Sequence, residues 1–153
     1  VEVIQTMTRI IESVEDSPLI KVPLSQPQVK NQRYITKSIC YHASQMADTI
    51  NAKAITTLTN SGYTAFQISA WRPKSHILVF TSNKRILTQL NLLWGVRAYF
   101  YDKLVSTDDT IDDINTICKE KKYVKKGDMV VNLAAMPIVA KGMVNTMRVS
   151  EIE

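Results

Sequence analysis

Residues 52–71 read AKAITTLTNSGYTAFQISAW. The first seven of these residues form a short apolar run rich in β-branched side chains, which is typical of a strand buried on both faces. The pattern then changes, and residues 62–71 are predicted to form a helix. A buried strand that leads through a short polar turn into a helix is the repeating unit of α/β proteins. This stretch therefore predicts the fold class.

The same alternation continues toward the carboxyl end of the chain. The residue patterns predict further strands at 76–80, 96–100, 129–135 and 145–152, helices at 83–90 and 108–122, and a long amphipathic helix at 31–51 before the first strand. The apolar face of this long helix is predicted to carry Ile35, Ile39, Ala43, Met46, Ala47 and Ile50. Residues 136–144 are too few for a crossover helix, so we expect the last two strands to pair antiparallel. The predicted architecture is a three-layer αβα fold with an open five-stranded, mostly parallel sheet whose last strand is antiparallel.

The amino-terminal part of the chain has a different character. Residues 1–16 carry Ile4, Met7, Ile11 and Val14 at helical spacing, and residues 17–30 contain enough proline to predict a linker. No initiator methionine or N-cap residue precedes the first helix, so we expect the chain to start inside a helix that belongs to a larger protein. Residues 31–153 then form one domain.

Composition narrows the possible classes of protein. The 153 residues are 45% hydrophobic, with no apolar run long enough to cross a bilayer and no signal-peptide pattern, so we expect a cytoplasmic domain with one core. Cys40 and Cys118 lie in helical stretches without metal-ligand spacing and are predicted to be reduced core residues. The net charge of +5 favours anionic partners but is too small to establish nucleic-acid binding.

No catalytic constellation is evident in the sequence. His42 and His76 have no nucleophile or second ligand at a suitable spacing, and both are interpreted as structural. Four aspartates gather at the start of the helix predicted at 108–122, where helix capping, with Thr107 or Asp108 as the cap, explains them without a metal ion. We therefore predict no catalytic residue and no metal site in this chain.

The turn after the first strand is the one candidate binding site. Thr59, Ser61 and Thr64 have hydroxyls that can donate to phosphate oxygens, and Asn60 and Gly62 complete a turn that opens a helix. Such a turn presents backbone N–H groups and the positive end of the helix dipole to an anion. The alternative is that Ser61 or Asn60 only caps the helix. The glycine and lysine spacing of a Walker loop is missing.

Several segments, in order, resemble the carboxyl-terminal domain of pyruvate kinases. They are TNSGYTA at 59–65, ISAWRP at 68–73, LNLLWGV at 90–96, KGDMVV at 126–131 and NTMRV at 145–149. Residues 1–15 also resemble the last helix of that family's catalytic barrel. In these enzymes the barrel transfers a phosphoryl group from phosphoenolpyruvate to ADP with magnesium and a monovalent cation, usually potassium. The resemblance therefore implies an enzyme whose active site lies outside this chain, and a chain that is inactive by itself.

The resemblance also implies roles for this domain. In the family it carries the site for phosphorylated effectors and one interface of the tetramer, and the turn at Thr59–Thr64 matches the loop that holds an effector phosphate. Residues 135–145 read AMPIVAKGMVN and lack the aromatic residue and arginine that the family often has there, although Lys141 can supply one charged contact. We therefore expect a monophosphate, such as a sugar phosphate or AMP, rather than fructose 1,6-bisphosphate. An effector site without function is the alternative.

The expected partners are the chain's own catalytic barrel, a phosphorylated small molecule, and further copies of the chain, with no nucleic acid and no membrane. A tetramer is implied for the full-length enzyme. Met147, Val149 and Ile152 mark the last strand as an apolar edge through which this chain is expected to form a dimer, unless Met147 and Val149 face the core. Two other functions stay open: a free-standing phosphate- or sugar-phosphate-binding module of the same fold, and a nucleic-acid binder.

Overall fold

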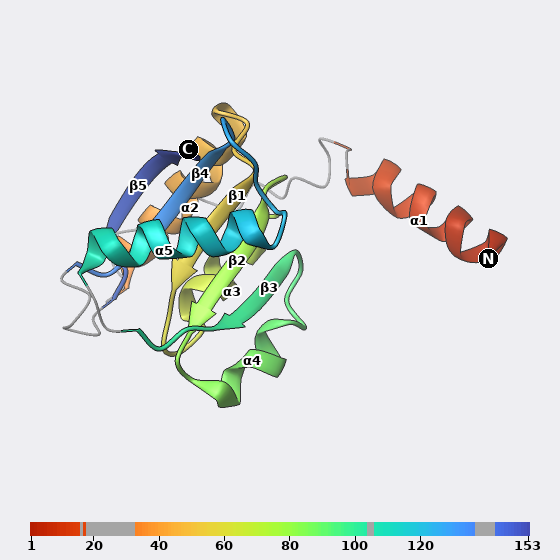
Figure 1. Ribbon diagram of the computed structural model, residues 1–153. Coiled ribbons are helices and arrows are strands. Elements are labelled where there is room, and N and C mark those ends of the chain that lie inside the picture. The colour runs from red at the N-terminus through yellow and green to blue at the C-terminus, as the bar shows by residue number, and fades with distance from the viewer. Residues whose placement is uncertain (16, 18–32, 104–105, 137–142) are drawn as a thin grey trace.

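The computed structural model describes residues 1–15, 17, 33–103, 106–136 and 143–153 (Figure 1). Every predicted helix and strand is present, with ends that differ by at most three residues. The helices are α1 (Glu2–Glu15), α2 (Tyr34–Thr49), α3 (Tyr63–Ala70), α4 (Lys84–Leu90) and α5 (Thr107–Glu120). The strands are β1 (Ala54–Leu58), β2 (His76–Thr81), β3 (Val96–Phe100), β4 (Met129–Ala134) and β5 (Thr146–Glu151).

The five strands form one sheet in the order β3-β2-β1-β4-β5. The first four strands are parallel, and β5 pairs antiparallel with β4, as predicted. The chain runs from β1 outward through β2 to β3 and then returns to place β4 on the other side of β1. The direction of winding therefore reverses between β1 and β4, which creates a topological switch point at the carboxyl ends of these two strands.

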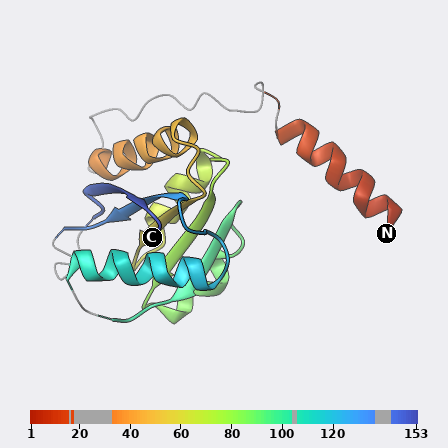
Figure 2. The ribbon, with the colours of Figure 1, turned by 45° about the horizontal axis from the view of Figure 1, so that its top comes forward.

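Helices cover both faces of the sheet, which confirms the three-layer prediction. Figure 2 shows α2 and α5 on opposite sides of the strands. The α2 side of the core includes Cys40, Ala43 and Ile68, and the α5 side includes Ile114 and Cys118. Both cysteines are free and buried, and burial raises the pKa of each thiol to about 12. Neither thiol is therefore available as a thiolate at neutral pH.

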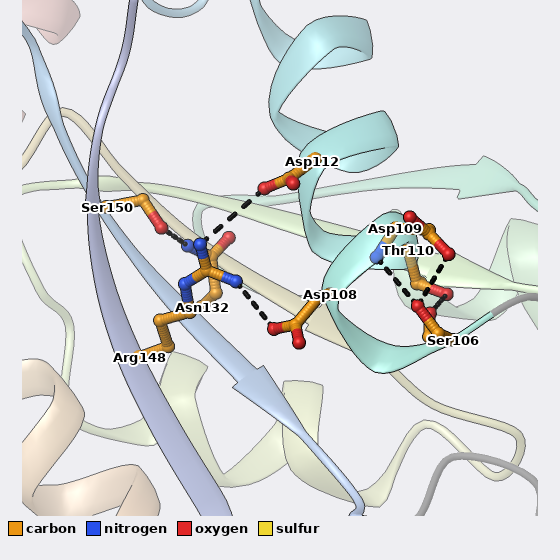
Figure 3. A network of polar contacts seen from close by, with 8 residues as sticks. All are labelled: Ser106, Asp108, Asp109, Thr110, Asp112, Asn132, Arg148 and Ser150. Carbon is orange, nitrogen blue, oxygen red and sulfur yellow. Dashed lines mark hydrogen bonds and ion pairs between the residues drawn. The ribbon is translucent and has the colours of Figure 1, made fainter.

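A chain of polar side chains crosses the buried part of the sheet. Thr56 on β1 donates its hydroxyl to Asn132 Oδ1 on β4 at 2.7 Å. Asn132 Nδ2 in turn donates to Ser150 Oγ on β5 at 3.0 Å, as Figure 3 shows. Thr56 and Asn132 are each 2% exposed. Because a buried amide left without partners is costly, these bonds favour the observed register of three neighbouring strands.

The aspartates at the start of α5 have structural partners. The helix is capped by Ser106, whose Oγ accepts from Asp109 N–H at 3.1 Å, so the expectation of Thr107 or Asp108 as the cap was wrong. Arg148 on β5 donates to Asp108 at 2.9 Å and lies 3.7 Å from Asp112 (Figure 3). Ser106 is favoured over Thr107 and Asp108 as the cap of α5 because its hydroxyl can also donate to the Asp109 carboxylate, at 2.6 Å.

Two apolar surfaces differ from the sequence interpretation. Ile35 was placed on the apolar face of α2, yet it is 47% exposed, whereas its neighbour Thr36 is buried. On β5, Val149 is exposed, whereas Met147 packs against the α2 side of the core. Ile152, which directly follows β5, is five positions from Met147 and is buried on the opposite, α5 side, so the three residues do not form one apolar edge.

Helix α1 has no buried residue, and it extends away from the layered domain (Figure 1). Its apolar residues Ile4, Met7, Ile11 and Val14 are all exposed. It meets the domain where Trp94 Nε1 donates to Glu15 Oε1 at 2.9 Å. Within the described ranges, the structure holds no helix with the length and apolar character that a membrane span requires.

Candidate functional site

A cleft of about 640 Å³ opens at the carboxyl ends of β1 and β4. Leu58, the last residue of β1, and Ala135, which directly follows β4, both line it. This is the topological switch point of the sheet, the place where open α/β proteins usually bind ligands. The volume also falls within the range of small-molecule sites, roughly 300–1,000 Å³.

The structure brings most of the predicted site residues to this cleft. Thr59, Asn60, Ser61 and Thr64 line it. Gly62 is the N-cap residue of α3 and has φ +78°, a left-handed conformation that favours glycine. A Cβ at this position would also lie 2.9 Å from Leu90 Cδ2. Lys141 lies outside the described residues.

The hydroxyls of the turn already hold the start of α3. Gly62 N–H donates to Thr59 Oγ1 at 3.1 Å, and Tyr63 N–H donates to Ser61 Oγ at 3.4 Å. Each hydroxyl uses a lone pair in this contact, which leaves its own proton available to a ligand oxygen. The N-cap residue of α3 is Gly62, which has no side chain to cap the helix, so Thr59 and Ser61 hold the turn before it and can also bind an anion.

Two cationic side chains at the cleft were missed from the sequence. Arg33 lines the cleft from just before α2, with its guanidinium 4.5 Å from the centroid of the Tyr63 ring. Lys103 lines it from the segment after β3 and pairs with Asp113 at 2.8 Å, which lowers the pKa of that carboxyl. No local motif marks either residue, because Arg33 lies 26 residues before Thr59 and Lys103 lies 39 residues after Thr64. Both reach the turn only through the order of the strands.

Polar groups of both signs complete the wall of the cleft. Asp102 adds an exposed carboxylate, Thr36 donates its hydroxyl to the carbonyl of Val144 at 3.0 Å, and Val144 itself lines the cleft. The remaining lining residues are Tyr63, Ser82, Tyr101 and Met143. Among the residues that the structure describes, no group of three His, Cys, Asp or Glu side chains is placed to share a metal ion.

Tyr101 stands out among the lining residues. It is 5% exposed, and within the described part of the chain its hydroxyl makes no hydrogen bond. The Asp113 carboxylate and the Thr110 hydroxyl lie close enough to shift the pKa of Tyr101, although neither meets the geometry of a hydrogen bond. Burial, together with the Asp113 carboxylate, raises the pKa of Tyr101 to about 12, so the group is a neutral donor at physiological pH. A buried donor without a partner in a cleft wall is suited to a ligand oxygen.

The family model described as "Pyruvate kinase, alpha/beta domain" matches residues 37–150. The chain belongs to that family. The resemblance found in the sequence is thereby confirmed for the domain. The match covers all elements from α2 to β5 except the ends of those two, and so it includes the turn at Thr59–Thr64.

Curated relatives support the family assignment over the whole length of the chain. A pyruvate kinase of Clostridium acetobutylicum is 29% identical over 153 residues, covering 100% of this chain and 32% of the relative. A pyruvate kinase of Geobacillus stearothermophilus is 32% identical over 99% of this chain and 26% of the relative. Pyruvate kinase 2 of Synechocystis is 34% identical over 88% of this chain and 22% of the relative. The chain thus spans about a third or less of these pyruvate kinases.

Solved structures of pyruvate kinases share the fold of the domain. A crystal structure of a Cryptosporidium parvum pyruvate kinase superposes with a TM-score of 0.70 at 24% sequence identity, covering 78% of this chain and 23% of that chain. At this level of identity the likeness establishes the α/β architecture.

Proposed function

We propose that this chain is the carboxyl-terminal regulatory and assembly domain of a cytoplasmic pyruvate kinase. The full-length enzyme would transfer a phosphoryl group from phosphoenolpyruvate to ADP in a barrel domain that uses magnesium and a monovalent cation, usually potassium. This chain would be inactive by itself. Family membership over residues 37–150 and relatives that are named pyruvate kinases support the proposal.

The proposed organisation assigns residues 1–16 to the last helix of the barrel, 17–30 to a linker and 31–153 to the regulatory domain. Within residues 1–16, the exposed apolar face of α1 supports the first assignment. Ile4, Met7, Ile11 and Val14 recur at helical spacing and are 65%, 52%, 52% and 45% exposed. Such a stripe is expected to be buried against another element, and a barrel domain would bury it.

We propose that the cleft takes a phosphorylated small molecule. The observation that carries this proposal is the position of the hydroxyl-rich turn: Thr59, Ser61 and Thr64 lie at the amino end of α3, at the switch point of the sheet. A phosphate there would accept from first-turn N–H groups and from the hydroxyls, and the helix dipole would favour its charge.

The rest of the cleft supports a monophosphate with a polar body. Arg33 and Lys103 add positive charge, and the buried Tyr101 hydroxyl adds a donor. Asp102 adds an acceptor of the kind that binds sugar hydroxyls. We propose Lys141 as one further charged contact. A sugar phosphate or a nucleoside monophosphate would combine these groups, since it has one dianionic end and several hydroxyls.

The proposal is tested by calorimetric titration of the chain with AMP, ribose 5-phosphate, glucose 6-phosphate and fructose 1,6-bisphosphate. We expect saturable binding of a monophosphate, weakened at least tenfold in Ser61→Asp because a carboxylate would repel the phosphate. Ser13→Asp, on the exposed surface of α1, makes the same charge change away from the cleft and should bind like the parent. Absence of binding by all four compounds, or equal affinity in Ser61→Asp, would contradict an effector site here.

A further inference from the structure

Asp102 is an acidic residue on the wall of a cleft that otherwise suits an anion. It lies two residues beyond the end of β3, and its side chain is exposed where it lines the cleft. Among the residues that the structure describes, its carboxylate makes no hydrogen bond and no ion pair. Asp102 therefore places a negative charge in the cleft that no cationic partner within the described ranges balances.

The neighbouring acid, Asp113, is in a different situation. The ammonium of Lys103 donates to the Asp113 carboxylate at 2.8 Å, and this bond lowers the pKa of that carboxyl. The charge of Lys103 is thus already balanced by Asp113. On this side of the cleft, two carboxylates and one ammonium leave one negative charge in excess, and Asp102 carries it.

The strand order places Asp102 across the cleft from the hydroxyl-rich turn. The turn at Thr59–Thr64 follows β1, Asp102 follows β3, and β2 lies between these two strands. Neighbouring strands lie about 4.8 Å apart, so the ends of β1 and β3 are separated by roughly 10 Å. When a phosphate lies at the turn, the other end of a small sugar phosphate is within reach of Asp102.

The chemistry of a carboxylate determines which group can lie next to it. A hydroxyl on a sugar can donate a hydrogen bond to the Asp102 carboxylate. A phosphate dianion has no proton to donate, so it would bring two like charges together without a hydrogen bond between them. The wall at Asp102 therefore favours an uncharged end of the ligand that carries hydroxyls.

We propose that Asp102 makes the cleft selective for sugar monophosphates over sugar bisphosphates. This inference rests on the proposed effector site and names the residue that determines its specificity. The carboxylate accepts hydrogen bonds from hydroxyls at the end of the sugar that is far from the bound phosphate. A second phosphate at that end is repelled.

The first test compares two ligands that differ only in the second phosphate, fructose 6-phosphate and fructose 1,6-bisphosphate. Both are titrated calorimetrically into the parent, Asp102→Asn and Asp102→Ala. We expect the parent to bind the bisphosphate about tenfold more weakly than the monophosphate, and this ratio to fall by about fivefold or more in both variants because the repulsion is gone. Asparagine keeps an acceptor oxygen for the hydroxyls, whereas alanine should also weaken binding of the monophosphate by about threefold to tenfold.

The second test separates repulsion from a structural role of Asp102. Raising the salt concentration from about 0.05 M to about 0.5 M should reduce the ratio of the two dissociation constants in the parent more than in Asp102→Asn, because salt screens the repulsion. A structural role would weaken both ligands alike at either salt concentration. Glu120→Gln, at the far end of α5, removes one exposed negative charge outside the cleft and should keep the ratio of the parent.

The outcomes distinguish this inference from the effector site on which it rests. Binding of the monophosphate that is lost in Ser61→Asp, with the same ratio of dissociation constants in the parent and in Asp102→Asn, would establish the site and overturn the selectivity. A parent that binds both ligands equally would overturn it as well. Absence of binding by either ligand would overturn the effector site, and the selectivity with it.

Discussion

Tyr101 shows how one side chain can serve packing and binding through different atoms. Its ring lies 6.2 Å from that of Phe80 in an edge-to-face arrangement, inside the core on the α5 side. Its hydroxyl is buried in the wall of the cleft and makes no hydrogen bond within the described residues. The ring therefore contributes to folding, whereas the hydroxyl is placed to donate to a ligand in the cleft.

Tyr101→Phe should leave stability at pH 7 within about 1 kcal/mol of the parent, because it removes only an unsatisfied group. The pKa of Tyr101 is about 12 in the folded chain, against about 10 in an unfolded one. Between these values the unfolded chain has lost the proton and the folded chain has kept it, so the stability of the parent falls as pH rises above about 10. The variant should lack this contribution.

Urea denaturation of both proteins at pH 7 and at pH 10–11 measures the effect, with Tyr34→Phe on the exposed side of α2 as the control. A loss of more than about 2 kcal/mol at pH 7 in Tyr101→Phe would mean that the hydroxyl has a partner in the folded chain.

The start of α5 depends on a side chain that precedes the helix. Ser106 accepts from the N–H of Asp109, and its own carbonyl accepts from the hydroxyl of Thr110 at 2.7 Å. Asp108 and Asp109 lie in the first turn and Lys119 in the last, which complements the helix dipole. The helix buries Ile114 and Cys118 against the sheet, so fraying of its first turn would weaken one layer of the fold.

Ser106→Ala should lower the free energy of unfolding by about 1 kcal/mol, because the orphan N–H of Asp109 loses its acceptor. Ser106→Asn keeps a side-chain oxygen in reach of that N–H and should retain most of the stability. Guanidinium denaturation of the three proteins measures both effects. Equal destabilisation by alanine and asparagine would show that the cap is not what Ser106 contributes.

At the scale of the whole domain, the outer edge of β5 is a candidate surface for assembly. Among the described strands, in the order β3-β2-β1-β4-β5, strand β5 pairs with β4 alone, so its other side is an edge of the sheet. Val149 on this strand is 39% exposed. Edges of this kind are usually covered or paired, and we propose that two copies of the chain associate here.

Sedimentation of the chain over a wide range of concentrations should show a dimer, and Val149→Lys should shift it toward monomer because a charge on an edge strand opposes pairing. Leu92→Lys is the matched control: Leu92 is 85% exposed and lies beyond α4, far along the chain from β5. A parent that stays monomeric, or an equal effect of both lysines, would argue against assembly through β5.

Local sequence patterns predicted the helices and strands of this domain well, but they predicted the surroundings of individual side chains poorly. The predicted strand at Val96–Phe100 has the same first and last residues as the observed β3. Such predictions succeed because the side-chain pattern of a strand or helix is contained in a few consecutive residues. Three expectations were wrong: the cap of α5, the burial of Ile35, and the apolar edge assigned to β5. Periodicity predicts the type of an element, but it does not determine which residue caps a helix or how deeply each apolar side chain is buried.

Part of the candidate site could also be predicted from the sequence, and part of it could not. The turn at Thr59–Thr64 was identified from sequence because hydroxyls, a glycine and a helix start follow one another directly, and local backbone geometry follows from local residue types. Only the tertiary structure revealed the other parts of the site. These are the switch point, the cations Arg33 and Lys103, and the Tyr101 hydroxyl that makes no hydrogen bond within the described residues. Strand order is set by long-range burial of both faces of the sheet, and that order alone brings these distant residues to the end of β1.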